Sequence, residues 1–176
     1  MLAQLRRLLA VAAVALPLGA CITSKYDIGA DLKPEFPIKP GAYVNKEGTI
    51  IDVRKLATEY RVFNRKNKDV SYARLYKIPE YPDYVFEFYE KRKPPTYYFY
   101  LKTTDKGFDF YDIDDLPGTV PEHLKPLLAQ VTDEEKKNNM IAVANGKRDT
   151  LYVIREVSRA NLKMKKIEKD SYERMP

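Results

Sequence analysis

The chain has 176 residues, of which 44% are hydrophobic and 32% charged, a composition typical of globular domains rather than of disordered chains. It contains 31 Lys and Arg against 25 Asp and Glu, so its formal net charge is +6. A single Cys and a single His exclude a disulfide framework and a Cys/His zinc site, and leave only His123 for a nucleophile–histidine pair.

Residues 1–20 have the layout of a secretory signal peptide. The basic pair Arg6 and Arg7 precedes an apolar run at residues 8–16, and two small residues follow. The apolar run is about half as long as the ~20 residues that a membrane-spanning helix needs. We therefore expect this segment to direct export and then to be removed.

The sole cysteine comes directly after this segment. Leu18-Gly19-Ala20-Cys21 resembles the lipobox of bacterial lipoproteins, in which Leu, two small residues and Cys direct lipid attachment and cleavage. The resemblance implies that Cys21 carries a diacylglycerol, becomes the first residue of the mature chain and is acylated on its amine. The alternative is a plain signal peptide followed by a chance cysteine.

An acylated Cys21 would make the lipid bilayer the first partner of the protein. Each buried CH₂ contributes ~0.8 kcal/mol, so two or three acyl chains hold a protein on a membrane essentially irreversibly. Residue 22 is Ile, whereas Asp at this position retains the lipoproteins of enteric bacteria in the inner membrane. The resemblance thus implies an outer-membrane anchor, on the periplasmic face rather than at the cell surface.

Residues 21–41 are predicted to be a semi-extended tether after the lipidated cysteine. Pro34, Pro37 and Pro40 disfavour both a helix and a central strand there. The remaining residues, 42–176, are numerous enough to bury one core without disulfides. We expect them to form a single globular domain.

The middle of the chain predicts an antiparallel sheet, because Tyr and Phe are abundant and favour pleated, half-buried surfaces. In residues 84–90 the alternation directs Phe86 and Phe88 toward the core. Strands separated by polar turns are expected at 49–56, 59–64, 69–78, 84–90, 96–103 and 108–114.

Helices are predicted in the C-terminal third. Two capping boxes, at residues 119–122 and 132–135, indicate two short helices. We expect Asn145-Gly146 to close the second helix, with a hairpin turn as the alternative, and residues 150–157 to return to strand. The basic tail is predicted to be weakly helical.

The predicted fold class is therefore α+β: an antiparallel β-meander of six or seven strands with short helices in the C-terminal third. A mostly-β barrel or sandwich is the alternative.

Two groups of polar residues could indicate a chemical site. His123 lies near a predicted helix start, but no neighbouring pattern supplies a partner that would make it a general base. Five carboxylates lie within eleven residues, but without the spacing of an EF-hand, so we interpret them as a solvated acidic face: Asp105, Asp109, Asp112, Asp114 and Asp115. We expect no catalytic residue, no metal and no cofactor.

The surplus of tyrosine, 14 residues against 7 Phe, suggests a binding surface, since Tyr combines an apolar ring with a hydroxyl that tolerates water. Four tyrosines are predicted to line an open sheet face that stacks on sugars or contacts a protein: Tyr72, Tyr76, Tyr98 and Tyr100. The alternative is a helix-covered core whose hydroxyls reach the rim. A basic hairpin turn would steer anionic partners at the edge of this surface: Lys91, Arg92 and Lys93.

The sequence thus favours a non-enzymatic envelope lipoprotein that binds a protein or glycan partner. The alternative is an envelope enzyme that acts on cell-wall or lipid material through carboxylates, although a glycosidase needs two of them about 5 to 10 Å apart and no pattern indicates such a pair. Nucleic acid is an unfavourable partner, because the small net charge gives a weak electrostatic footprint.

Overall fold

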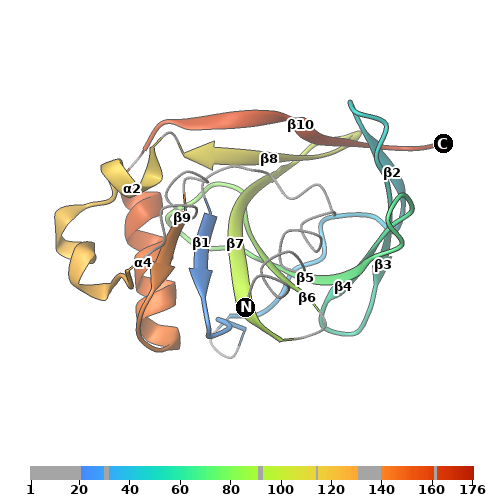
Figure 1. Ribbon diagram of the computed structural model, residues 1–176. Helices are drawn as coiled ribbons and strands as arrows, with labels where there is room; N and C mark the ends of the chain where they lie inside the picture. The colour runs from blue at the N-terminus through green and yellow to red at the C-terminus, as the bar shows by residue number, and fades with distance from the viewer. Residues whose placement is uncertain (1–20, 30–31, 91–92, 114, 131–139, 161) are drawn as a thin grey trace, which may run out of the picture.

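A computed structural model of the chain describes residues 21–29, 32–90, 93–113, 115–130, 140–160 and 162–176 (Figure 1). Side chains are described for all of these except residues 21, 90 and 93–95. The predicted signal peptide, the second capping box and the turn residues Lys91 and Arg92 lie outside the described residues. No helix in the described part of the chain is long and apolar enough to cross a membrane.

Eight antiparallel strands close into a barrel (Figure 1). Neighbouring strands are linked by short turns up to β8, and β10 returns after an insertion to pair with both β8 and β2. β6 also pairs with β7, with Phe86 opposite Phe99, so the eight strands form a closed ring. The barrel strands are β2 (Gly41–Asn45), β3 (Ile50–Lys55), β4 (Tyr60–Asn64), β5 (Val70–Tyr76), β6 (Tyr84–Glu90), β7 (Lys93–Thr103), β8 (Gly107–Ile113) and β10 (Met164–Arg174).

Alternate side chains of these strands fill the interior of the barrel, as the period of a pleated strand requires. Aromatic rings dominate, and Phe110 makes edge contacts with Phe86, Phe99 and Phe108. The buried interior side chains are Ile38, Tyr43, Ile51, Val53, Tyr60, Val62, Ala73, Leu75, Phe86, Phe88, Phe99, Leu101, Phe108, Phe110 and Tyr172.

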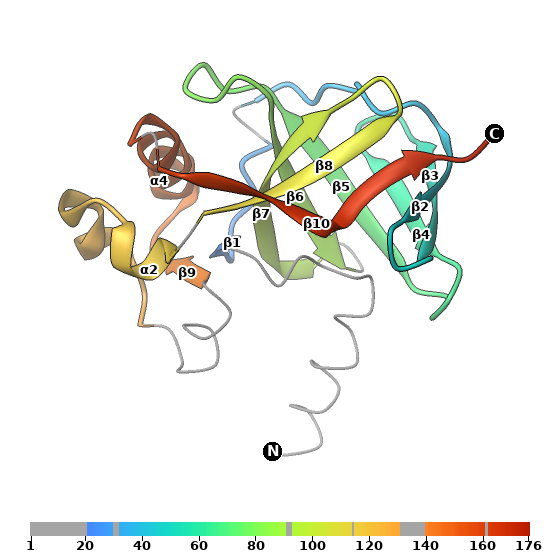
Figure 2. The ribbon, with the colours of Figure 1, turned by 90° about the horizontal axis from the view of Figure 1, so that it is seen from above.

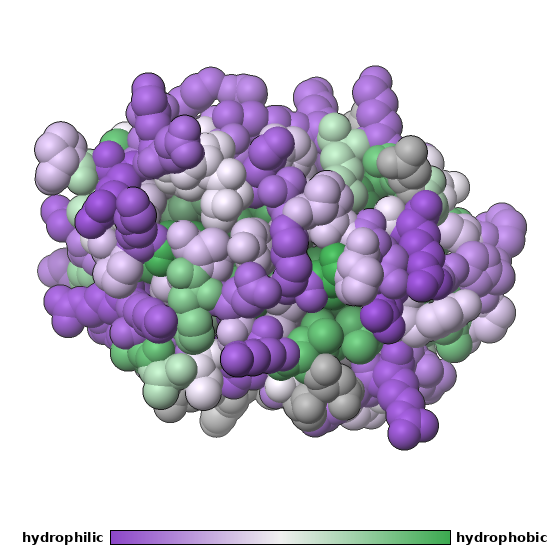
Figure 3. Space-filling model, turned by 180° about the vertical axis from the view of Figure 1, so that it is seen from behind, coloured by the Kyte–Doolittle hydropathy of each residue, from purple (hydrophilic) through white to green (hydrophobic). Residues whose placement is uncertain are grey.

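A second layer covers one outer wall of the barrel (Figure 2). It comes from the insertion between β8 and β10, which contains α2 (Leu116–Thr119), the 3₁₀ helix η1 (Glu122–Leu127), β9 (Met140–Val143) and α4 (Lys147–Arg159). Helix α4 buries Val153, Ile154 and Val157 against this wall. The outer wall contributes Tyr76, Val85, Tyr98, Tyr100 and Ile113 to this second core. Seen from behind, the surface of the molecule is largely hydrophilic, with smaller hydrophobic areas between the polar side chains (Figure 3).

Strand β1 (Cys21–Ser24) joins the second layer to the barrel. It pairs antiparallel with β7 and parallel with β9. The predicted tether is therefore wrong for the segment that follows Cys21. Ile28 is fully buried, and Ile38, between Pro37 and Pro40, exchanges two hydrogen bonds with the Tyr60 hydroxyl, so apolar residues both before and among the prolines dock on the barrel.

The antiparallel strands predicted between residues 49 and 114 are confirmed, and they follow one another in sequence order. The mostly-β barrel describes their arrangement better than an open α+β meander. Closure depends on β10, whose charged sequence has little strand propensity of its own and is specified by pairing with β8 and β2.

Three predictions for the C-terminal third are wrong. Residues 150–157 are helical within α4, because the buried positions Thr150, Val153, Ile154 and Val157 recur at helical rather than strand spacing. Residues 140–143 form β9, and Gly146 precedes α4 instead of ending a helix. The tail contains β10 and not a helix.

Candidate functional site

Among the described residues, charged and hydrogen-bonding side chains are most concentrated on the outer wall of the barrel, under the segment that follows β1. Arg74 on β5 and Glu87 on β6 are directly opposite each other in the strand register. Both point outward, because their neighbours Leu75, Phe86 and Phe88 point into the barrel. Glu87 is 0% exposed.

Both carboxylate oxygens of Glu87 accept hydrogen bonds. The backbone N–H of Ile28 donates to Oε1 at 3.1 Å, and the Tyr98 hydroxyl lies 3.0 Å from the same oxygen. The Tyr76 hydroxyl donates to Oε2 at 2.9 Å. The Tyr98 hydroxyl also lies 2.8 Å from the carbonyl oxygen of Tyr26, so it connects Glu87 to the N-terminal segment.

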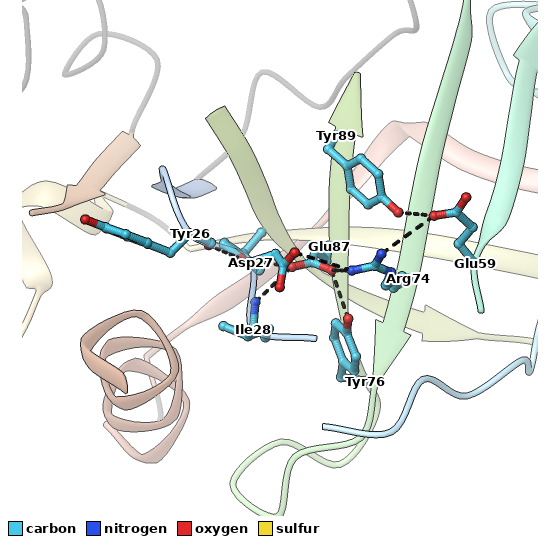
Figure 4. Close-up of polar contacts among 9 residues, drawn as sticks. Tyr26, Asp27, Ile28, Glu59, Arg74, Tyr76, Glu87 and Tyr89 are labelled. Atoms are coloured by element: carbon cyan, nitrogen blue, oxygen red, sulfur yellow. Dashed lines mark hydrogen bonds and ion pairs between the residues drawn. The ribbon is translucent and has the colours of Figure 1, made fainter. Parts of the chain in front are cut away.

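Arg74 joins three carboxylates into one cluster (Figure 4). Its guanidinium lies 3.5 Å from Glu87, 3.7 Å from Asp27 and 3.8 Å from Glu59. Figure 4 shows the guanidinium between Glu87 and Glu59, and the Tyr89 hydroxyl donates to Glu59. We call these residues, with Tyr76 and Tyr98, the Arg74 cluster.

Burial sets the electrostatics of the Arg74 cluster. It raises the pKa of Glu87, although hydrogen bonds from Tyr76, Ile28 and Tyr98 and the charge of Arg74 act in the opposite direction. Burial disfavours the charged guanidinium of Arg74, but its neighbours outweigh that effect and raise its pKa. Arg74 therefore stays charged and compensates the carboxylates.

The Arg74 cluster holds the N-terminal segment against the barrel. A Cβ at Gly29 would lie 2.6 Å from the Tyr76 hydroxyl and 2.8 Å from Arg74, so glycine permits this close approach. Ile22 and Ile28 are buried beside it, and each contributes roughly 1.5–3 kcal/mol. Glu87 is enclosed by these groups and has no exposed surface for a substrate.

The predicted open tyrosine face is wrong for Tyr76, Tyr98 and Tyr100, which are all buried. The alternative of a covered core is the one observed, since α4 and the N-terminal segment cover this wall. The Tyr100 hydroxyl lies 3.0 Å from Ser158 Oγ and 3.2 Å from the carbonyl oxygen of Ile154. Tyr72 is half-buried and stacks on Tyr89.

The predicted basic turn lies largely outside the described residues. Lys91 and Arg92 lie outside the described residues, and Lys93 begins β7 without a described side chain. Among the described residues, the large aromatic side chains that are exposed are Tyr26, with an exposed fraction of 40%, and Tyr152, with 44%.

His123 is exposed on η1 and lies 3.2 Å from Glu156 on α4. This contact links two pieces of the second layer. Tyr152 lies nearby with its ring centroid 6.5 Å from that of His123.

The acidic residues of this stretch differ in their exposure to solvent. Asp109 is buried and pairs with Lys166 at 3.0 Å, whereas Asp105 and Asp115 are exposed. Asp114 lies outside the described residues. Within the described ranges, no group of three or more His, Cys, Asp or Glu side chains could hold a metal ion.

One feature of the sequence points to Glu87, although not to the other members of the Arg74 cluster. Glu87 interrupts the outward face of an otherwise aromatic strand, and a lone carboxylate in such a strand indicates either exposure or a buried partner.

A second buried carboxylate, Asp170 on β10, has no hydrogen-bond partner among the described residues. Burial raises its pKa to about 6.

Comparison with protein-family models, with curated proteins and with solved structures found no match to this chain.

Proposed function

We propose that the protein is a non-enzymatic, lipid-anchored protein of the bacterial cell envelope that binds a protein or glycan partner. Cys21 carries the lipid, and the outer membrane is its site of attachment, with the barrel on the periplasmic side. The lipobox resemblance of Leu18-Gly19-Ala20-Cys21 is the basis for the anchor.

The observation that carries this proposal is the position of β1. Residues 22–24 directly follow Cys21, the residue that the lipobox resemblance makes the mature N-terminus, and they pair with both β7 and β9. These pairings use only residues that remain after cleavage before Cys21.

The alternative is an envelope enzyme that uses carboxylates, and Glu59 and Glu87 on either side of Arg74 are the residues it would use. Hydrolysis of a glycosidic bond requires both carboxyl groups to flank the substrate. Glu87 is enclosed by Ile28, Tyr76 and Tyr98, which favours a structural role for this carboxylate.

The experiment is in-cell cross-linking followed by purification from membranes, with the wild type and Cys21→Ser compared at equal expression. We expect the wild type to yield a reproducible cross-linked partner from the membrane fraction and Cys21→Ser to lose both membrane retention and that partner. We also expect the Glu59→Gln variant to yield the same cross-linked partner in this assay, which would show that partner binding does not depend on the Glu59 carboxylate. Turnover of cell-wall or lipid substrate that Glu59→Gln abolishes would instead establish the enzyme.

A further inference from the structure

Strand β1 connects Cys21 to the barrel without slack. Ile22, the next residue, is paired with Tyr98 of β7 on one side and with Ile141 of β9 on the other. Its side chain is 1% exposed and lies in the core between the barrel and the second layer. No free residue separates the cysteine from the folded domain.

The residues after Ile22 are fixed by further contacts. Ser24 Oγ lies 2.8 Å from Thr150 Oγ1 on α4, and the Ile28 N–H donates to Glu87 on β6. The segment therefore contacts β7, β9, α4 and β6. Detaching β1 would expose Ile22 and Ile28 to water and would remove the Ile28 N–H from the hydrogen-bond donors of Glu87. Both losses oppose detachment, so β1 stays paired when a force acts on Cys21.

We propose that β1 is a rigid mount that holds the barrel flush on the bilayer in one orientation, with the β1 side facing the lipid headgroups. The inference rests on the proposed lipid anchor. A tether of 20 residues would reach about 60 Å at ~3 Å per residue. A domain of this size is itself only roughly 40 Å across. The mount therefore confines every surface of the barrel to the zone next to the membrane.

The residues that follow β1 suit a bilayer surface. Lys25 and Tyr26 are both exposed, and Tyr26 is one of the few exposed large apolar side chains among the described residues. An extended chain places Tyr26 within about 17 Å of Cys21. Tyr is enriched at membrane interfaces, and a lysine is attracted to anionic headgroups. This chemistry fits a headgroup layer that contains phosphatidylglycerol.

The test uses the acylated full mature protein in vesicles of phosphatidylethanolamine and phosphatidylglycerol that include a spin-labelled headgroup lipid. Because Cys21 is acylated, an introduced cysteine provides the one free thiol for a fluorophore. Lys25→Cys reports on the β1 side. The second position is Lys106→Cys in the turn between β7 and β8, and this turn lies away from β1 in both ribbon views (Figures 1 and 2). The matched variant carries a flexible Gly-Ser linker of about ten residues between Cys21 and Ile22, with a span of roughly 17 Å.

We expect several-fold stronger quenching at position 25 than at position 106, and a fall at position 25 toward the level of position 106 when the linker is present. Thermal melting of each variant verifies that the barrel is folded. Equal quenching at the two positions, or no effect of the linker, overturns the rigid mount. Mass spectrometry of the same samples separates the two hypotheses, because an unacylated Cys21 overturns the lipid anchor as well, whereas acylation with equal quenching overturns the mount alone.

Discussion

The backbone N–H of Ile28 donates to Oε1 of Glu87 across 3.1 Å, although the two residues are 59 positions apart in the chain. This bond attaches the N-terminal segment to the outer wall of the barrel at a carboxylate that is completely buried. The proline-containing residues that follow are attached by Ile38, which exchanges two hydrogen bonds with the Tyr60 hydroxyl.

Glu87→Ala should destabilise the protein by about 3–5 kcal/mol, because it removes the acceptor of the Ile28 N–H and of the Tyr76 hydroxyl, one acceptor of the Tyr98 hydroxyl and one carboxylate partner of Arg74. Chemical denaturation of the purified mature protein measures the change in the free energy of unfolding. Glu168→Ala is the matched control, since Glu168 forms an exposed ion pair with Lys46 and its loss should leave stability nearly unchanged. Equal stability of the two variants would show that the Arg74 cluster does not hold the segment.

Asp170→Asn should stabilise the protein above pH 6. The buried Asp170 has a pKa of about 6, raised from 3.8, so the native state binds this proton more tightly than the unfolded chain. The stability that the bound proton contributes is complete below about pH 4 and is lost as the pH rises through 6, which amounts to ~3 kcal/mol at most. The variant minus wild-type difference should therefore grow from pH 4 to 6 and then level off. A difference that is flat over this range would contradict the raised pKa.

The pair Tyr98→Ala and Tyr100→Ala should unfold or severely destabilise the domain, because each buried aromatic truncation costs about 3–5 kcal/mol. Tyr152→Ala, at an exposed ring on α4, is the control and should melt with the wild type. Circular dichroism melts provide the comparison. An unchanged melting temperature for the Tyr98 and Tyr100 pair would mean that these rings face solvent after all.

The barrel strands could be predicted because their signal is local. Phe86, Phe88, Phe108 and Phe110 alternate with outward residues, and the turns between strands are short and polar. Closure could not be predicted in the same way. It depends on β10, which follows β8 only after a long insertion and has few apolar residues, so its conformation comes from its two neighbours.

The Arg74 cluster was beyond prediction for a related reason. Its members come from the N-terminal segment, the end of the β3–β4 turn, and strands β5, β6 and β7, and only the fold brings Asp27, Glu59 and Glu87 to one guanidinium. The tyrosines were identified as unusual, but their exposure was predicted wrongly. The second layer that covers them includes α4, whose β-branched residues favoured a strand interpretation.

The central claim is that Cys21 is the acylated first residue of the mature protein, and intact mass analysis of the N-terminal peptide tests it most directly. The account predicts that a protein purified from bacterial membranes begins at Cys21 and carries a diacylglycerol on sulfur, with a further acyl chain on the amine. Cys21→Ser should yield a protein without these chains that leaves the membrane fraction. A wild-type chain that retains residues 1–20, or a mature chain whose Cys21 carries a free thiol, would contradict the account.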